Sequence, residues 1–329
     1  MPMNTVQWGM IGCGDVTEVK SGPAFNKIEN SRLLAVTGRS EARVRSYAQQ
    51  HGIPRPYAEA ALLLADPDIH AVYIATPPSS HMHYTLMAAA AGKAVYVEKP
   101  MALNHDECLR MIQACQAASV PLFTAYYRRS LPKFLKIKEL LDRQAIGEIR
   151  LVSVHLLLSP RPEDLRKEAL PWRVLPEISG GGYMVDVGAH QLDLLDFLFG
   201  PIEAVAARTA NQAHWYPAED IVCAHFRFAS GILGSAMWCF TLSQTTPMDR
   251  TEIVGSSGKI TYTTFDSSPI RLETGEGMQE IELPWPQHVQ QPHIDTIVRE
   301  LRGIGKCPST GISGARTTRV MDEILGSTL

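Results

Sequence analysis

The first 125 residues alternate short apolar stretches with longer segments that have helical patterns. The stretches have the β-branched and aromatic composition of buried strands, and they cover residues 6–11, 33–37, 71–75, 95–97 and 122–125. Helices are expected between them, for example from a Ser40 N-cap to Gly52, over residues 80–92 and over residues 104–118. Repeated βα units of this length predict a parallel, doubly wound Rossmann sheet with right-handed crossovers.

The pattern changes after about residue 126. A helix (131–143), a strand (149–158) and a long helix after Gly180-Gly181-Gly182 come first. Strands then follow strands at residues 204–209, 221–228, 232–240, 252–254 and 259–263, with a hairpin at Ser230-Gly231, before two final helices near 293–302 and 313–325. We therefore predict an α/β protein with two domains. Residues 1–125 would bind a dinucleotide, and residues 126–329 would form an α+β domain with a large, mostly antiparallel open sheet for substrate binding and oligomerisation.

Composition and charge exclude several classes of protein. The chain has 329 residues, 45% of them hydrophobic and 20% charged, and its formal net charge of −3 argues against a nucleic-acid surface. Its six cysteines contain no Cys-x-x-Cys pair that would indicate a zinc site. The start, Met1-Pro2-Met3-Asn4, lacks a signal-peptide pattern, and no apolar run is long enough to span a bilayer. We expect a soluble, cytoplasmic protein with no metal, nucleic-acid or membrane partner.

Two glycines follow the first predicted strand, in Gly12-Cys13-Gly14-Asp15-Val16. Placed at the first βα turn, their backbone N–H groups can cradle a pyrophosphate at the start of a helix. The third position of the usual fingerprint is Thr17, and Gly22-Pro23 is expected to end the helix early. A tight turn without a ligand is the alternative, but the position favours nucleotide binding.

The strand at residues 95–97 ends abruptly at Glu98-Lys99-Pro100. Ligands of open parallel sheets bind beyond the carboxyl ends of the strands, so Lys99 is predicted to face a ligand. A solvated turn lysine is the alternative for this motif taken alone.

A second cluster of polar residues follows the three glycines at 180–182. On a helix from about Gly182, Asp186, His190, Asp193 and Phe197 would share one face, and residues 185, 188, 192, 195 and 199 would pack into a core on the other. A histidine one turn from an aspartate is often a structural pair. The preceding glycines favour a functional site, because they let the backbone lie close to another group.

These motifs together resemble the glucose–fructose oxidoreductase and inositol dehydrogenase family, abbreviated Gfo/Idh/MocA. The matching pieces are Gly12-x-Gly14, Thr76-Pro77-Pro78-x-x-His81, Glu98-Lys99-Pro100 and the glycine run followed by Asp186, His190 and Asp193. The resemblance implies that Lys99, Asp186 and His190 are catalytic. It also implies that Thr76, Pro77 and His81 border the nicotinamide with Glu98 and Lys99, and that Trp172-Arg173 faces the substrate.

The expected chemistry is hydride transfer between nicotinamide and a carbinol or carbonyl carbon. Histidine suits the accompanying proton transfer, because its unperturbed pKa lies near neutrality, and a lysine ammonium would stabilise the developing alkoxide. Asp186 would orient one of the two. The sequence does not decide which of Lys99 and His190 transfers the proton; we favour His190.

The substrate pocket is predicted to use Tyr127, Arg128, Trp172 and Arg173 together with Asp186 and His190. An equal alternative is that Arg128 and Arg129 hold a domain junction. The resemblance implies a sugar, an anhydro-sugar, a cyclic polyol or a dihydrodiol as substrate. A cofactor-dependent glycosidase and a non-catalytic NADP-binding sensor are the alternative functions.

The second strand ends in Gly38-Arg39-Ser40 where NAD-selective proteins usually carry a carboxylate. Glycine leaves room for a 2′-phosphate, which Arg39 and Ser40 could bind. NADP(H) is therefore expected over NAD(H), although Glu41 could instead rotate in to bind the ribose of NAD. A homodimer or higher homo-oligomer is expected too, because the predicted helices are too few to cover both faces of the second sheet and residues 232–240 are apolar on both sides.

Overall fold

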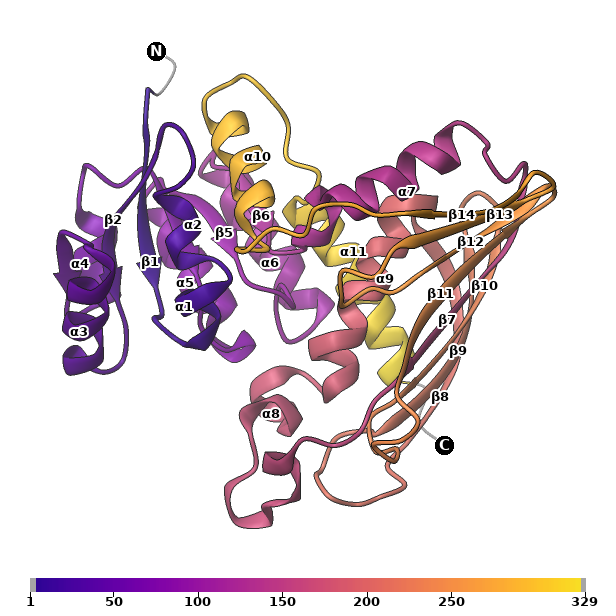
Figure 1. Ribbon diagram of the computed structural model, residues 1–329. Helices are drawn as coiled ribbons and strands as arrows, with labels where there is room; N and C mark the ends of the chain where they lie inside the picture. The colour runs from indigo at the N-terminus through magenta and orange to yellow at the C-terminus, as the bar shows by residue number, and fades with distance from the viewer. Residues whose placement is uncertain (1–3, 327–329) are drawn as a thin grey trace. The chain divides into compact units, whose positions relative to one another are not determined.

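The computed structural model describes residues 4–326, so the first residues, on which the signal-peptide expectation rests, lie partly outside it. The chain forms two compact units (Figure 1). Unit 1 comprises Met1–Leu131 and Pro286–Ala315, and unit 2 comprises Pro132–Trp285 and Arg316–Leu329. This division differs from the expected boundary at 125/126, because residues 286–315 return to the first unit.

Within the described residues, unit 1 contains a six-stranded parallel sheet in the order β3-β2-β1-β4-β5-β6. Its strands are β1 (Val6–Ile11), β2 (Ser31–Thr37), β3 (Arg55–Tyr57), β4 (Ala71–Ile74), β5 (Ala94–Val97) and β6 (Leu122–Thr124). Its helices are α1 (Asp15–Val19), α2 (Gly22–Phe25), α3 (Glu41–His51), α4 (Ala60–Ala65), α5 (His81–Ala90), α6 (His105–Ala117) and α10 (Gln291–Leu301). The predicted doubly wound Rossmann fold is confirmed.

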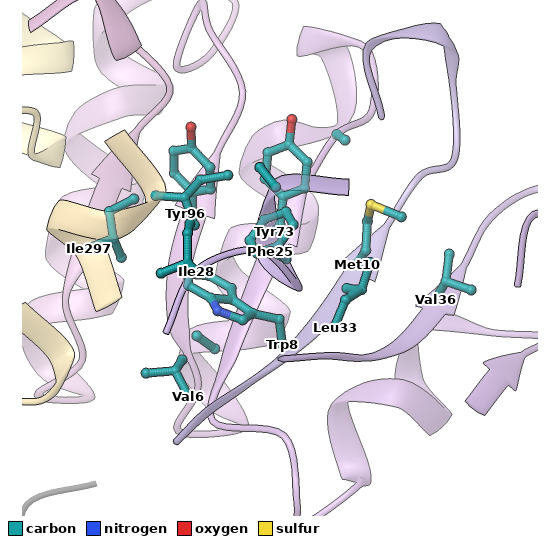
Figure 2. Close-up of a cluster of buried hydrophobic side chains, with 14 of the residues drawn as sticks. Val6, Trp8, Met10, Phe25, Ile28, Leu33, Val36, Tyr73, Tyr96 and Ile297 are labelled. Atoms are coloured by element: carbon teal, nitrogen blue, oxygen red, sulfur yellow. The ribbon is translucent and has the colours of Figure 1, made fainter. Parts of the chain in front are cut away.

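Both faces of this sheet are buried, because successive strand residues point to opposite sides. On β4, Tyr73 belongs to a core with residues of α2, α3 and α10, whereas Val72 belongs to a second core with residues of α4, α5 and α6. Figure 2 shows the first core, in which the rings of Tyr73 and Tyr96 stack at 4.9 Å between centroids and their hydroxyl groups point the same way. The Tyr73 hydroxyl donates to Glu98, which follows β5, and the Tyr96 hydroxyl donates to Gln290, which precedes α10.

Over the described part of the chain, unit 2 contains an eight-stranded sheet in the order β14-β13-β12-β11-β7-β10-β9-β8. Its strands are β7 (Ile149–Leu157), β8 (Ile202–Ala210), β9 (Ile221–Phe228), β10 (Leu233–Cys239), β11 (Met248–Gly255), β12 (Gly258–Tyr262), β13 (Ile270–Thr274) and β14 (Gly277–Ile281). Among these neighbours, β7 and β10 are the one parallel pair. The predicted mostly antiparallel sheet is confirmed, including the β9–β10 hairpin, whereas the β13–β14 hairpin and the short β3 and α4 were not predicted.

The helices of unit 2 include α7 (Pro132–Asp142), α8 (Pro176–Ser179) and α9 (Ala189–Phe199), and α11 (Gly311–Leu325) runs from unit 1 into unit 2. The short helical turns along the chain are η1 (Pro78–Ser80), η2 (Tyr127–Ser130), η3 (Pro162–Leu165), η4 (Lys167–Ala169) and η5 (Trp172–Val174). One face of the sheet is closed by ring contacts such as Phe199–Phe228 and Phe134–Tyr262. Large apolar side chains on the other face stay exposed, including Leu233 and Met237 on β10.

The long helix expected after Gly182 is two segments. Residues Met184–Gly188 form a π-helical turn, η6, and α9 continues from Ala189. A π-turn has one more residue per turn than an α-helix, so the face that a regular 3.6-residue period predicts is shifted. The predicted face is therefore not continuous from Asp186 to His190, and the polar side of α9 is buried too, because Asp193 is 1% exposed.

Candidate active site

The glycine turn after β1 has the geometry of a close backbone crossing. Gly12 has φ of +101°, and a Cβ there would lie 2.7 Å from the carbonyl oxygen of Ala75 at the end of β4. Gly14 is the N-cap of α1 and carries no capping side chain. Asp15 is exposed and pairs with Arg43 at 3.4 Å, while Val16 packs against the core. The turn thus leads the chain across the carboxyl end of the sheet.

The departure at Thr17 is compensated by Gly22. Thr17 is fully buried, and its Oγ1 donates to the carbonyl oxygen of Gly14 at 2.7 Å. A Cβ on Gly22 would lie 2.2 Å from the carbonyl oxygen of Thr17 and 2.3 Å from the hydroxyl of Tyr47. The close packing that a third glycine of the fingerprint usually provides is therefore supplied five residues later, where α1 has already ended as predicted.

The end of β2 presents Gly38, Arg39 and Ser40 beside this turn. A Cβ on Gly38 would lie 3.3 Å from the sulfur of Cys13, so Gly38 packs directly against the glycine turn. Arg39 is exposed, and the hydroxyl of Ser40 caps α3 by accepting from the backbone N–H of Arg43. Glu41, the alternative ribose-binding residue, accepts a hydrogen bond from Arg45 one turn along α3.

The turn after β4 is tied to the turn after β5 by His81. The imidazole is fully buried, with Nε2 2.7 Å from the carbonyl oxygen of Thr76 and Nδ1 2.9 Å from that of Pro100. Burial lowers the pKa of His81. Because both ring nitrogens meet backbone oxygens, the histidine joins the residues 76–78 turn to the Glu98-Lys99-Pro100 turn. A direct contact of His81 with the cofactor remains a prediction.

Glu98 is the centre of a buried hydrogen-bond network. Its Oε1 accepts from the Tyr73 hydroxyl at 2.5 Å and from Gln290 Nε2 at 2.7 Å, and its Oε2 accepts from the backbone N–H of Lys99 at 3.1 Å. The side-chain oxygen of Gln290, Oε1, accepts a hydrogen bond from the Tyr96 hydroxyl at 2.7 Å. The side chain of Lys99 is half-buried at the end of this network. The charge of Glu98 is therefore used to hold the backbone that carries Lys99.

These residues of unit 1 suit a bound dinucleotide. The glycine turn, Arg39, Thr76 and Lys99 follow β1, β2, β4 and β5, respectively. They therefore lie together at the carboxyl-terminal ends of the strands, where α/β proteins bind ligands. The positive φ of Gly12 and its contact with Ala75 leave no room there for a side chain. A Cβ on Gly14 would meet no atom within 4 Å, so the backbone at the start of α1 is open to a group that lies close to it, as a pyrophosphate does.

In unit 2, η6 and η5 bring the expected substrate residues together. Arg173 Nε lies 3.3 Å from Asp186 Oδ2, and the Arg173 guanidinium stacks over the Trp172 ring at 4.6 Å. His190 is 6% exposed and is the second residue of α9, one turn after Asp186. The ring of Phe265 meets the His190 imidazole edge-on, with 6.2 Å between centroids. The ion pair with its stacked indole and the imidazole with its edge-on phenyl ring therefore lie on consecutive segments, η6 and α9.

Asp193, the remaining carboxylate of the predicted helix face, and the nearby Asp196 have structural partners. Asp193 is buried and accepts from Thr317 Oγ1 on α11 at 3.4 Å. Asp196 receives two hydrogen bonds from the Arg316 guanidinium, at 2.8 and 2.7 Å. For Asp193 the structure thus favours a role in joining α9 to α11.

The three glycines before η6 are needed for packing within the protein. A Cβ on Gly182 would lie 2.7 Å from the Cβ of Ala218, and a Cβ on Gly181 would lie 2.5 Å from Cγ2 of Val185. Gly182 N–H donates to Glu219 Oε1 at 3.0 Å. Burial raises the pKa of Glu219 to about 7, although this carboxylate is partly exposed. The glycines predicted that the backbone here lies close to another group, and in the structure that group is the loop before β9.

The residues of η2 are buried in unit 1. Tyr127 is 6% and Arg128 5% exposed, and the Arg128 guanidinium lies 5.0 Å from the Tyr127 ring centre. Arg129 donates to the carbonyl oxygen of Pro308 at 3.2 Å, so it anchors the returning C-terminal segment. The alternative of a structural role fits Arg129, and substrate contacts of Tyr127 and Arg128 remain predictions.

Sequence reasoning missed Gln290, Glu219 and Phe265. Gln290 and Glu219 lie in loops and act through contacts to residues far away in the chain, and neither belongs to a motif. Phe265 lies in the loop between β12 and β13, and a single aromatic residue next to a strand gives no sequence signal for a site. Within residues 4–326, no helix is long and apolar enough to cross a membrane, and no cluster of His, Cys, Asp and Glu is suited to a metal ion.

Two family descriptions match this chain. An oxidoreductase family with an NAD-binding Rossmann fold matches residues 6–126, and the GFO/IDH/MocA C-terminal domain matches residues 134–261. The chain is 38% identical over 322 residues to the protein called Oxidoreductase P35 of Formosa agariphila, covering 98% of this chain and 99% of that one. The protein belongs to the Gfo/Idh/MocA family of oxidoreductases.

More distant similarities agree with this family. The 1,5-anhydro-D-fructose reductase of Ensifer adhaerens is 26% identical over 94% of this chain and 92% of its own. A solved structure of levoglucosan dehydrogenase in complex with NADH and levoglucosan superimposes with a TM-score of 0.88 at 20% identity, covering 98% of this chain and 97% of that chain. At that identity the structural likeness shows the fold alone.

Proposed function

We propose that this protein is an NAD(P)-dependent dehydrogenase or reductase that transfers a hydride between nicotinamide and a carbinol or carbonyl carbon of a sugar, an anhydro-sugar, a cyclic polyol or a dihydrodiol. The observation that carries the proposal is the cluster in unit 2, where Arg173 pairs with Asp186 beside Trp172 on the segment that leads into His190. Such a mixture of charge and aromatic surface suits a ligand with many hydroxyls and an apolar ring face. The anhydro-fructose activity named for a relative supports the same substrate class.

In this proposal the bound NAD(P) supplies the hydride chemistry, and the protein supplies position and charge. Gly12, Gly14 and the start of α1 would hold the pyrophosphate, and the turns after β4 and β5 would border the nicotinamide. Lys99 stabilises negative charge that develops on the reacting oxygen, and the Glu98 network fixes the backbone that carries it. His190 takes up or gives the proton of that oxygen, and Asp186 is held by its ion pair with Arg173.

We further propose that NADP(H) is preferred. Gly38 carries no carboxylate at the end of β2, Arg39 is exposed there, and Ser40 keeps a hydroxyl proton to donate because it caps α3 as an acceptor. The hydrogen bond between Glu41 and Arg45 disfavours the alternative in which Glu41 binds the ribose of NAD.

The test is to follow NADPH and NADH absorbance with a panel of keto-sugars, and NADP⁺ and NAD⁺ with cyclic polyols, anhydro-sugars and dihydrodiols. The proposal expects turnover with at least one substrate class and faster turnover with the phosphorylated cofactor. Release of free sugar without a net change in cofactor absorbance would show a glycosidase instead. Tight NADPH binding without any turnover across the panel would favour a sensor.

A further inference from the structure

The loop between β12 and β13, residues 263–269, is anchored by side chains from three other elements of unit 2. Oδ2 of Asp249 accepts hydrogen bonds from the backbone N–H groups of Thr264 and Phe265, each at 2.7 Å. Nζ of Lys133 on α7 donates to Thr263 Oγ1 at 2.8 Å and to the carbonyl oxygen of Asp266 at 3.2 Å. These bonds fix the loop backbone immediately on both sides of Phe265.

The third anchor comes from α9, the helix that begins beside His190. Gln191 donates from Nε2 to Thr264 Oγ1 at 3.3 Å, and its carbonyl oxygen accepts from the Trp238 indole at 2.7 Å. Gln191 is 2% and Lys133 3% exposed. Burying an amide or ammonium group costs free energy unless the group is hydrogen-bonded. Because these two side chains make their hydrogen bonds to the loop, they hold it in a defined position next to His190.

The anchored loop presents Phe265 to His190. The phenyl ring is partly exposed and meets the imidazole at 73° between ring planes, with 6.2 Å between centroids. This edge-to-face geometry is a favourable one for aromatic rings. The phenyl ring and the imidazole are thus close enough for one cyclic ligand to contact both.

We propose that Phe265 is a substrate-contacting residue, which packs against the C–H face of a cyclic sugar or polyol while the reacting hydroxyl meets His190. Asp249, Lys133 and Gln191 act as positioning residues that hold the loop. This inference rests on the proposed function, and it adds an aromatic wall to the substrate site from a part of the chain outside the recognised motifs.

The variants Phe265→Leu and Phe265→Ala test the proposal, with Ser267→Ala on an exposed position of the same loop as the control. For the cyclic substrate with the highest turnover, Phe265→Ala is expected to lower kcat/KM by roughly 10–200-fold through a raised KM, the usual range for lost apolar pocket contacts. Phe265→Leu should fall between Phe265→Ala and the wild type. The Kd for NADPH and the thermal unfolding of Phe265→Leu and Ser267→Ala should match the wild type.

Calorimetric binding of the same cyclic compounds to the enzyme–cofactor complex separates this inference from the proposed function. Wild-type binding without turnover, lost in Phe265→Ala, would support the aromatic wall and contradict the oxidoreductase function. Wild-type turnover with KM unchanged in both Phe265 variants would overturn the role of Phe265 and leave the function standing. A wild type that neither binds nor turns over any cyclic compound would overturn both.

Discussion

At the scale of single residues, cofactor choice depends on the end of β2. Replacing Arg39 by alanine should raise KM for NADPH roughly tenfold or more, because a hydrogen bond to a charged group contributes about 1.5–3 kcal/mol. KM for NADH should stay nearly unchanged. The control is Arg32→Ala, an exposed arginine near the opposite end of the same strand. Equal losses for both cofactors would mean that Arg39 supports the fold or the adenine and not a 2′-phosphate.

Glu219 predicts a specific dependence of stability on pH. Its pKa is raised from 4.5 to about 7 in the folded protein, so the folded state binds this proton more tightly than the unfolded chain. The contribution of Glu219 to the free energy of unfolding therefore falls as pH rises from about 4.5 to 7 and is constant above that. Glu219→Gln keeps an acceptor for Gly182 N–H and removes the titration, so the variant should gain stability over the wild type as pH rises through this range.

Urea unfolding of wild type and Glu219→Gln at several pH values measures this difference. His293, whose pKa burial lowers to about 4, makes stability rise with pH between about 4 and 6.5, and it contributes equally to both proteins. Taking the difference between the two proteins cancels that contribution. A difference that does not change with pH would show that Glu219 titrates normally.

At the scale of elements, hydrogen bonds of Gln290 join the segment before α10 to the turn that carries Lys99. Gln290→Leu leaves the buried Tyr96 hydroxyl and Glu98 without one partner each, and should reduce the free energy of unfolding by roughly 2–4 kcal/mol. It should also lower kcat more than it changes KM for NADPH, because Lys99 loses its fixed backbone. Denaturant unfolding and steady-state kinetics measure the two effects, with the exposed Gln287→Leu as the control. Wild-type kcat in a destabilised Gln290→Leu would limit the role of Gln290 to the fold.

The elements that were predicted correctly have local signals. Apolar strands alternate with capped helices in the first unit, and the expected cap of α3 is seen at Ser40 and Gly52. The errors have non-local causes. The π-turn at Met184–Gly188 follows a glycine run that packs against Ala218, and no period within the helix encodes either feature. Residues 286–315 belong to unit 1 because of contacts such as that of Gln290 with Glu98, which is 192 positions earlier in the chain.

The same reasoning separates the motif residues of the site from the others. Lys99, Asp186 and His190 stand in short motifs at strand and helix ends, so their positions on the fold could be expected from the sequence. Their supporting residues could not, because a glutamine such as Gln290 or a phenylalanine such as Phe265 gains its role only from tertiary contacts.

At the scale of the whole molecule, we predict a homodimer through the exposed face of the unit 2 sheet. Leu151, Leu233, Met237 and Met248 lie on neighbouring strands of this sheet and are 45%, 59%, 39% and 39% exposed. Exposed apolar patches of this kind usually mark an interface. Light scattering at micromolar concentration should give the mass of two or more chains, and Leu233→Arg should shift the protein toward the monomer. The control is Leu62→Arg, at an exposed leucine of α4. A monomeric wild type would contradict this prediction.

The central claim is that Lys99 and His190 catalyse hydride transfer on a sugar or polyol. The most direct measurement is kcat, with the best substrate and NADP(H), for Lys99→Ala and His190→Ala beside the exposed controls Lys167→Ala and His214→Ala. Each catalytic variant should lose roughly two to four decades in kcat, the usual scale for lost charge stabilisation or acid–base catalysis. The Kd for NADPH should change far less, and the controls should match the wild type. Near wild-type turnover in both Lys99→Ala and His190→Ala would contradict the assignment.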